Sequence, residues 1–352
     1  MGKTDIRSLS LEETERLLLD MGEKKFRAKQ IYSWLHKKQT DDFDNMTDLS
    51  VALRNKLKEN CEILKLKIVK KLMSNEDETV KYLFETNDAN VIECVLMKYS
   101  YGYAACISSQ IGCRMGCTFC ASTVDGLERN LTAGEMVGEV YKIQNDCKNR
   151  IGNIVIMGSG EPLDNYDNII QFLKIINSKE GNSLGARHIT VSTCGLAEKI
   201  YDMAELELQI TLAISLHAPN DEIRKRLMPI ANKYSVDEVI KAASYYAEKT
   251  KRRVTYEYAL IDGINDSKKA ARELADRLKG SLCHVNLIPI NDVSESGYKK
   301  SSEKTIAEFK DILSEKNIQT TIRRELGSDI NAACGQLRKS YADKQHDIDP
   351  EV

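Results

Sequence analysis

Residues 106–120 read CISSQIGCRMGCTFC and hold four of the ten cysteines of the chain. Three of them, Cys113, Cys117 and Cys120, follow the spacing C-x3-C-x2-C, and Phe119 stands directly before the last. Thiolates are soft ligands that suit iron–sulfur clusters, zinc or copper(I), and an ordinary four-iron cluster takes four of them. Because this group stops at three, a cluster bound here would keep one iron open for another ligand. The alternatives are three reduced structural cysteines and a zinc site that a distant residue completes.

The composition is that of a globular protein in a reducing compartment. Its 352 residues suffice for a barrel-sized domain and a smaller one. No apolar run approaches the roughly 18 residues that span a bilayer, and the N-terminal MGKTDIRSLSLEET lacks the apolar core of a signal peptide. Ten cysteines in such a chain predict reduced thiols and a cytoplasmic location without a membrane partner. The net charge of −2 excludes a global basic field, so any nucleic-acid site must be a local patch.

Residues 1–62 predict a small helical domain. Ser10 and Glu13 form the pattern of a capping box before the first helix. The apolar residues at helical spacing are Leu17, Leu18, Met21, Phe26, Ile31, Trp34, Leu35, Leu53 and Leu57. The basic residues around them are Lys24, Lys25, Arg27, Lys29, Lys37, Lys38, Arg54, Lys56 and Lys58. A solvated face is the simpler interpretation of these cations, and an RNA-binding accessory domain is the alternative.

In residues 63–100 apolar and polar side chains alternate with the period of two that is typical of strands. This pattern predicts a small antiparallel β linker. From 101 to 340 strands and helices alternate, which predicts parallel strands with crossover helices. The predicted strands are 103–109, 153–157, 188–193, 210–215, 253–260, 283–290 and 318–323. The predicted helices are 133–147, 165–178, 196–204, 220–227, 236–250, 266–279 and 303–316. Six βα units are too few for a closed eight-stranded barrel, so the fold class is α/β with a partial (β/α)6 barrel, followed by a disordered tail at 341–352.

Polar and small residues follow the ends of several predicted strands. The stretches are Gly158-Ser159-Gly160-Glu161-Pro162, Ser192-Thr193-Cys194-Gly195, Ser215-Leu216-His217-Ala218-Pro219 and the single residue Asn291. Each alone could belong to a turn or a helix cap. Because active sites of such sheets lie at the carboxyl ends of the strands, together they predict a polar-lined cofactor pocket below the three-cysteine loop. Glu161 could meet an ammonium group, and for His217 a hydrogen bond to a ribose or to backbone is favoured over a metal.

Two further cysteines stand out by their positions. Cys106 lies on the strand before the three-cysteine loop, and Cys334 lies in a run of small residues, NAACGQ. The simpler interpretation is two buried small apolar side chains. That interpretation is kept for the cysteines without a motif, which are Cys61, Cys94, Cys147, Cys194 and Cys283.

These motifs together resemble the RlmN/Cfr family of radical S-adenosylmethionine (SAM) RNA methyltransferases. The resemblance runs nearly end to end. Its carriers are C-x3-C-x2-C, GLERNLTAGEM (126–136), MGSGEPLDN (157–165), STCG, ISLHAPND (214–221), NLIPIN and the segment from RREL through GSDI to NAACGQL. The family pattern at GSDI would be Gly-Arg-Asp, so this segment is a departure toward the Cfr branch.

The resemblance implies a role for each matching residue. Cys113, Cys117 and Cys120 would hold a [4Fe-4S] cluster whose open iron chelates SAM. The residues expected to contact SAM are Gly160, Glu161, Ser192, Ser215, Leu216, His217 and Asn291. Cys334 would carry a methyl group, Cys106 would be its partner cysteine, and Glu93 would transfer a proton.

The implied reaction methylates carbon 2 of an adenosine in 23S rRNA and of the adenosine beside the anticodon in some tRNAs. The same resemblance implies two SAM molecules per turnover, a transient protein–RNA adduct and a Cys106–Cys334 disulfide. It also implies an external electron donor, such as flavodoxin or ferredoxin, and a monomeric enzyme. Arg323, Arg324, Arg338 and Lys339 are further candidates for phosphate contacts. The alternatives are a Cfr-like carbon-8 methyltransferase and, in another class, a zinc-stabilised RNA-binding protein without enzymatic activity.

Overall fold

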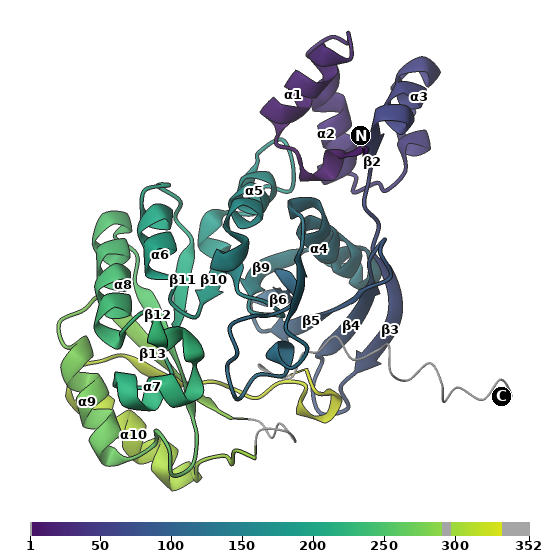
Figure 1. Ribbon diagram of the computed structural model, residues 1–352. Coiled ribbons are helices and arrows are strands. Elements are labelled where there is room, and N and C mark those ends of the chain that lie inside the picture. The colour runs from purple at the N-terminus through teal and green to yellow at the C-terminus, as the bar shows by residue number, and fades with distance from the viewer. Residues whose placement is uncertain (1, 291–296, 333–352) are drawn as a thin grey trace, which may run out of the picture.

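One mixed β-sheet runs through the computed structural model, which describes residues 2–290 and 297–332 (Figure 1). In that part of the chain the strand order is β14-β13-β12-β11-β10-β9-β6-β5-β4-β3. The parallel strands are β6 (Gly102–Ile107), β9 (Ile151–Ile156), β10 (Ile189–Thr193), β11 (Thr211–Ser215), β12 (Val254–Leu260), β13 (Cys283–Pro289) and β14 (Thr320–Ile322). The predicted partial barrel of six βα units is therefore confirmed, and β14 extends it by a short strand.

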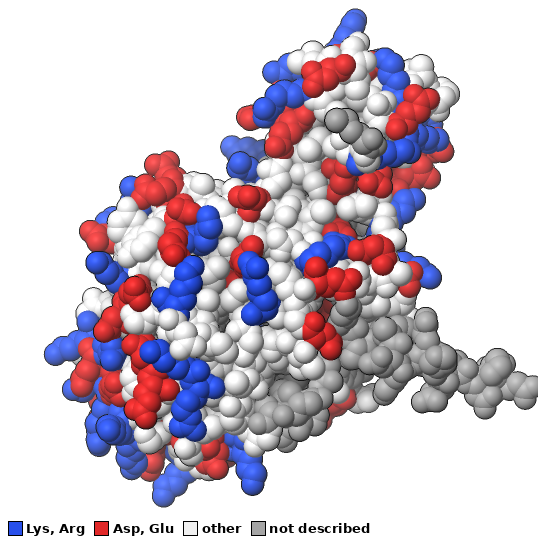
Figure 2. All heavy atoms as spheres, in the orientation of Figure 1, with Lys and Arg blue, Asp and Glu red and all other residues white. Residues whose placement is uncertain are grey.

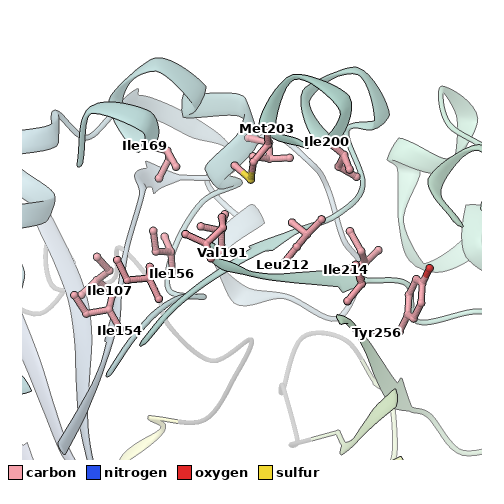
Figure 3. Close-up of a cluster of buried hydrophobic side chains, with 14 of the residues drawn as sticks. Ile107, Ile154, Ile156, Ile169, Val191, Ile200, Met203, Leu212, Ile214 and Tyr256 are labelled. Atoms are coloured by element: carbon pink, nitrogen blue, oxygen red, sulfur yellow. The ribbon is translucent and has the colours of Figure 1, made fainter. Parts of the chain in front are cut away.

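Helices connect the parallel strands as the sequence pattern predicts. They are α4 (Ala133–Cys147), α5 (Tyr166–Asn177), α6 (Ala197–Ala204), α7 (Asp221–Leu227), α8 (Val236–Thr250), α9 (Lys268–Leu278) and α10 (Glu303–Glu315). Figure 3 shows the core between these helices and the sheet, where Ile156, Val191 and Leu212 of the sheet lie opposite Ile169 and Met203. No helix among the described residues is long and apolar enough to span a membrane.

The expected β linker consists of β3 (Lys67–Met73), β4 (Val80–Glu85) and β5 (Val91–Tyr99), which pair antiparallel as predicted. These strands do not form a sheet of their own, because β5 also pairs antiparallel with β6. Val95 lies opposite Cys106 in this pairing, and Glu93 precedes Val95 by two residues on β5. Since alternate residues of a strand point to the same face, Glu93 and Cys106 share a face of the sheet.

The N-terminal helices are α1 (Leu11–Asp20), α2 (Arg27–His36) and α3 (Val51–Asn60), and they project from the barrel (Figure 1). The capping box is confirmed, since Ser10 and Glu13 exchange backbone-to-side-chain hydrogen bonds. Strands β1 (Thr4–Asp5) and β2 (Cys61–Glu62) join the two ends of this unit. Its core is separate from the barrel core and contains Ile31, Leu53 and Leu57. The prediction that Phe26 belongs to the apolar face of this domain is wrong. The residue is 53% exposed, and the Arg27 guanidinium lies over its ring.

A short hairpin that the sequence analysis did not predict closes the base of the three-cysteine loop. Its strands are β7 (Gln110–Gly112) and β8 (Leu127–Asn130), and they pair antiparallel. Cys113 N donates a hydrogen bond to Gly126 O at 2.9 Å directly above this hairpin. Strands of three and four residues are too short for a visible alternation, so they left no pattern to recognise.

Glu139 of α4 is a fully buried carboxyl group behind the end of β6. Its Oε2 accepts hydrogen bonds from Ser108 N at 2.9 Å and from the Cys94 thiol, and no hydrogen-bond partner of Oε1 is present among the described residues. Burial raises the pKa of Glu139 from 4.5 to about 8. The folded protein therefore keeps this proton in a range of pH where the unfolded chain has released it.

We expect the stability contributed by this proton to be present below about pH 4.5 and to be lost as the pH rises through about 8. Glu139→Gln cannot titrate, so its free energy of unfolding should gain about 3 kcal/mol relative to the wild type between pH 5 and pH 8. Urea unfolding of both proteins across this range measures the difference. Glu59→Gln, at an exposed position of α3, is the control. Parallel curves for the wild type and Glu139→Gln would contradict the assignment.

Candidate functional site

A cavity of about 160 Å³ opens at the carboxyl ends of the parallel strands. It collects residues that are far apart in the sequence, from the three-cysteine loop and from the ends of β9, β10 and β11. The predicted site residues that line it are Cys113, Cys117, Cys120, Gly160, Glu161, Ser192, Ser215 and His217. The side chain of Leu216 is fully buried in the main core and does not line the cavity. Asn291 lies outside the described residues.

The three-cysteine loop is fixed against the barrel by several contacts. Thr118 N donates to Leu227 O at 2.9 Å, and Phe119 packs edge-on against His217 with a centroid distance of 4.9 Å. Burial raises the pKa of the Cys113 thiol to about 12 and that of Cys117 well above its ordinary range. These thiols therefore become thiolates only beside a strong positive charge, such as bound metal.

The three cysteines of the loop offer thiol ligands of the kind that iron–sulfur clusters use. A four-iron cluster binds its thiolates on separate irons, so it needs three thiols around one cavity rather than three at one point. Cys113, Cys117 and Cys120 line one cavity together with polar strand-end residues. The donor set therefore fits a cluster with an open position toward the cavity.

The loop after β9 brings Gly160 and Glu161 to the cavity wall. Ser159 O accepts hydrogen bonds from Ser109 N and Gln110 N at 2.8 and 3.1 Å, and Glu161 N donates to Gln110 Oε1 at 2.8 Å. These bonds hold the backbone of the Gly-Ser-Gly-Glu turn against the strand end that precedes the three-cysteine loop. The turn and that loop therefore line the cavity together.

The Glu161 carboxylate links two strand ends. Its Oε1 accepts from Leu163 N at 2.9 Å, and its Oε2 accepts from Cys194 N at 2.7 Å in the loop after β10. Burial raises the pKa of Glu161. The side chain thus orders the pocket through backbone groups, and its contact with a cofactor ammonium stays a prediction.

His217 lines the cavity and binds the backbone of β12 through one ring nitrogen. Its Nδ1 lies 2.9 Å from Ala259 N, and since a backbone N–H only donates, Nδ1 must be the acceptor. Burial lowers the pKa of His217 to about 3, so the ring is neutral and carries its proton on Nε2. The expected hydrogen bond between His217 and neighbouring backbone is confirmed.

Arg224 and Glu257 were not assigned to the site from the sequence. Arg224 of α7 is fully buried and donates to the carbonyl groups of Cys194, Leu216 and Tyr234, so it holds the loops after β10 and β11 together. Glu257 of β12 lines the cavity, and Asn286 donates to its carboxylate at 2.8 Å. Arg224 is one of three consecutive basic residues, and Glu257 is one polar residue in a strand. Nothing in the neighbouring sequence therefore indicates that either belongs to the site.

Arg323 is one of the candidates for phosphate contacts, and that role stays a prediction. It lines the cavity wall, and its Nη1 lies 4.0 Å from Glu257 Oε2. Its side chain is 25% exposed. The guanidinium therefore lines the cavity beside a buried carboxyl group.

A second cavity of about 40 Å³ adjoins the first, and both are lined by Ile288 and Arg323. Its wall includes Cys106 of β6, Tyr99 of β5 and Ala332. The structure therefore brings Cys106 close to the segment that precedes Cys334 in the sequence, while Cys334 itself lies outside the described residues.

Glu93 lies on the same sheet face as Cys106 and is buried. Its Oε2 lies 2.9 Å from Lys81 Nζ. Two cavities thus meet at one end of the sheet, the larger lined by the three cysteines and the smaller by Cys106.

Comparisons with known proteins agree with this geometry. The family model of the radical SAM superfamily matches residues 107–313, and that of the ribosomal RNA large subunit methyltransferase N-terminal domain matches residues 4–63. A protein of Alkaliphilus oremlandii named "Probable dual-specificity RNA methyltransferase RlmN" is 58% identical over 97% of this chain and 99% of its own length. A protein of Lachnoclostridium phytofermentans with the same name is 56% identical over 97% of this chain and 96% of its own length.

A solved structure extends the likeness to three dimensions. The radical SAM methyltransferase from Sphaerobacter thermophilus has a TM-score of 0.91 and 43% identity, and the match covers 96% of this chain and 99% of that one. The similarity therefore includes the N-terminal helices, the antiparallel strands and the barrel together.

Proposed function

The chain belongs to the RlmN family of radical SAM RNA methyltransferases, and from this premise we propose that it methylates carbon 2 of an adenosine in 23S rRNA and in some tRNAs. The observation that carries the proposal is the meeting of two cavities, one lined by the three-cysteine loop and one by Cys106. Family membership also favours an enzyme over the alternative of a zinc-stabilised RNA-binding protein.

A radical SAM enzyme uses a [4Fe-4S] cluster and SAM, and the larger cavity supports specific holders for both. Cys113, Cys117 and Cys120 would bind the cluster. Gly160, Glu161, Ser192, Ser215 and His217 would surround SAM, with the Nε2 proton of His217 available to an acceptor on it. When bound and reduced by an external donor such as flavodoxin or ferredoxin, this pair supplies a 5′-deoxyadenosyl radical.

Carbon 2 of adenine is electrophilic and bears no acidic proton, so direct transfer of a methyl cation from SAM to it fails. A covalent route through a protein sulfur divides the difficult step into easier ones. In this proposal Cys334 receives a methyl group from one SAM. Cleavage of a second SAM would remove one hydrogen atom from that methyl group and leave a carbon radical on the Cys334 side chain. This carbon would add to carbon 2 of the adenine, and loss of one electron to the cluster and of the carbon-2 proton would restore the aromatic ring.

Cys106 and Glu93 would complete the turnover. The Cys106 thiolate attacks the Cys334 sulfur, which breaks the bond between that sulfur and the new methyl carbon and forms a Cys106–Cys334 disulfide. Glu93 moves the proton that this release requires. Reduction of the disulfide restores the thiols, which fits an enzyme working in a reducing cytoplasm.

The position of methylation is the first quantity to measure. Anaerobically reconstituted protein is given SAM, a reductant and an rRNA fragment, and the digested nucleosides are identified by mass spectrometry. We expect 2-methyladenosine from the wild type and none from Cys334→Ala. 8-Methyladenosine would instead assign the chain to Cfr-like chemistry, toward which GSDI at 327–330 departs. Cleaved SAM with no methylated adenosine would overturn the RNA substrate.

Basic residues of the N-terminal helices are the proposed phosphate contacts. Figure 2 shows charges of both signs mixed over the face in view, so an RNA site there depends on particular side chains. Lys25 is 66% exposed and pairs with Glu15 at 2.9 Å, and Lys24 and Arg27 lie beside it at the start of α2.

We expect the combined variant Lys24→Ala, Lys25→Ala, Arg27→Ala to bind RNA more weakly and to reduce the slope of log K against log salt by about 2. SAM cleavage without RNA should be unchanged. Filter binding between 50 and 200 mM salt measures the slope. Exposed lysines of α8 and α10, Lys241, Lys249 and Lys304, provide the matched triple control. An unchanged slope in the first triple variant would refute the assignment.

A further inference from the structure

The segment 326–332, which precedes Cys334, is attached to the turn between β3 and β4. The Asp329 carboxylate accepts hydrogen bonds from Ser74 Oγ at 2.7 Å and from Asn75 N at 2.8 Å. The Asp77 carboxylate accepts from Gly327 N at 3.0 Å. Ser328 Oγ donates to Glu76 at 3.0 Å. We call turn residues 74–77 with their bonds to 327–329 the C-terminal clamp.

The backbone of the clamp requires a glycine. Gly327 has a φ of +61°, and a Cβ at this position would lie 2.8 Å from Thr79 Cγ2 and 2.9 Å from Ala332 Cβ. The residue of GSDI that departs from the family pattern is Ser328, which stands where the pattern has arginine. Its side chain forms one of the clamp's hydrogen bonds, to Glu76. The contact joins parts of the chain about 250 residues apart, and it attaches residues 327–329 to the turn between β3 and β4.

Lys81 of β4 forms a second attachment deeper in the same place. Its side chain is only 7% exposed, and its Nζ lies 2.9 Å from Glu93 Oε2. The same Nζ donates to Asn331 O at 3.1 Å. A lysine is almost never so deeply buried unless it is paired, and here one ammonium joins a strand carboxylate to the backbone of the C-terminal segment.

The strand register places Lys81 in line with Cys106. Lys81 lies opposite Val95 in the β4–β5 pairing, and Val95 lies opposite Cys106 in the β5–β6 pairing. Directly opposed residues in antiparallel strands point to the same face, so Lys81, Val95 and Cys106 form one row across the sheet. Lys81 therefore attaches Asn331 above the face that carries Cys106.

We propose that Lys81 is a positioning residue for methyl transfer: with the C-terminal clamp it holds the segment that leads to Cys334 over Cys106 and Glu93. The inference rests on the proposed function, since it assumes that Cys334 and Cys106 act on one substrate. Cys334 follows Asn331 by three positions along the chain, which limits the distance between their Cα atoms to about 11 Å. Attaching Asn331 thus restricts the region that the Cys334 sulfur can reach.

The positioning role differs from simple charge compensation. A lysine that only neutralised Glu93 would need one contact, whereas Lys81 also bonds the Asn331 carbonyl. The clamp fixes the same segment independently through Asp329, whose side chain is on the surface. Weakening either attachment should therefore produce the same kind of defect.

Lys81→Met keeps the apolar stem and removes the cation. We expect the kcat for methyladenosine to fall by about 100-fold, because misplacement of a reacting group by about 1 Å has effects of that size, while the KM for RNA changes little. The ratio of 5′-deoxyadenosine formed to adenosine methylated should rise, and the iron content and visible absorption of the cluster should be unchanged. Nucleoside mass spectrometry and iron analysis provide these values.

Three further variants separate positioning from folding. Lys81→Arg keeps a cation with several donors and should restore coupling in part. Asp329→Ala breaks the clamp at the surface and should raise the same ratio by a smaller factor. Lys67→Met, which removes an exposed lysine 3.9 Å from Glu85, should behave as the wild type.

Unchanged coupling in both Lys81→Met and Asp329→Ala would overturn the proposal. Loss of the cluster or of RNA-independent SAM cleavage in Lys81→Met and Lys81→Arg alike would also overturn it, because the defect would then lie in folding. If the wild type itself forms no methyladenosine, the proposed function fails. This outcome is distinct from failure of the positioning proposal, which requires an active wild type.

Discussion

Replacing Cys106 with alanine is expected to leave the protein covalently attached to its RNA, with turnover reduced to less than one methylated adenosine per enzyme. In the proposed reaction the Cys106 thiolate is the group that attacks the Cys334 sulfur, so without it the bond to the adenine persists. Cys106 and Ala332 both line the smaller cavity. Ala332 stands two positions before Cys334 in the sequence. The loss of one sulfur from a buried strand should leave the fold intact.

Denaturing gel electrophoresis with end-labelled RNA measures the adduct directly. Wild type should show free methylated RNA, and Cys106→Ala should show a slowly migrating protein–RNA band that Cys334→Ala abolishes. Cys94→Ala is the matched control, because Cys94 is buried on the same strand as Glu93 but on the opposite face, beside Glu139. Multiple turnovers by Cys106→Ala would assign the release step to another group.

Gly160→Ala is expected to abolish SAM binding and SAM cleavage, with a loss of more than about 100-fold, while the cluster still assembles. Gly160 has a φ of +104°, which side chains disfavour. A Cβ at this position would lie 2.5 Å from Gln110 Cβ and 2.8 Å from Gln110 N. Gln110 holds Glu161 N at 2.8 Å, so the added methyl group would push the turn away from the strand end and displace the cavity wall.

Equilibrium dialysis with labelled SAM and quantification of 5′-deoxyadenosine test this prediction. Gly280→Ala is the matched control, since Gly280 also has a positive φ, of +79°, but has no atom within 4 Å of an added Cβ. The control should lose some stability and retain SAM binding. If both variants bind SAM normally, the tight contact between the Gly160 turn and Gln110 is not needed for the pocket.

Local patterns predicted the elements of the barrel well because each pattern reports a short-range cause. The capping box before α4 marks its start, since Thr132 and Glu135 exchange hydrogen bonds across three residues. Apolar strand runs between amphipathic helices specified a parallel sheet. The rule that sites lie at strand ends predicts Gly160, Ser215 and His217 in one pocket, and all three line the same cavity.

Contacts between distant segments had no such signal. Arg224 resembles any arginine in a basic helix, yet it is fully buried and holds three loop carbonyls. Lys81 reads as a lysine on an alternating strand, yet it bonds Asn331, 250 residues away. The cause of each contact is a partner that lies elsewhere in the chain, so nothing near the residue itself predicts it.

The sequence by itself determined the three-cysteine loop, the order of the βα units and, through the nearly complete series of motifs, the family. These depend on spacing along the chain, which the sequence states directly. Only the tertiary structure decided that the antiparallel strands continue the barrel sheet, that Lys81 and Cys106 lie in one row, and that residues 327–331 are attached above them. Backbone hydrogen bonds at a sheet edge are alike for every sequence, so the choice of neighbour depends on how the whole chain packs.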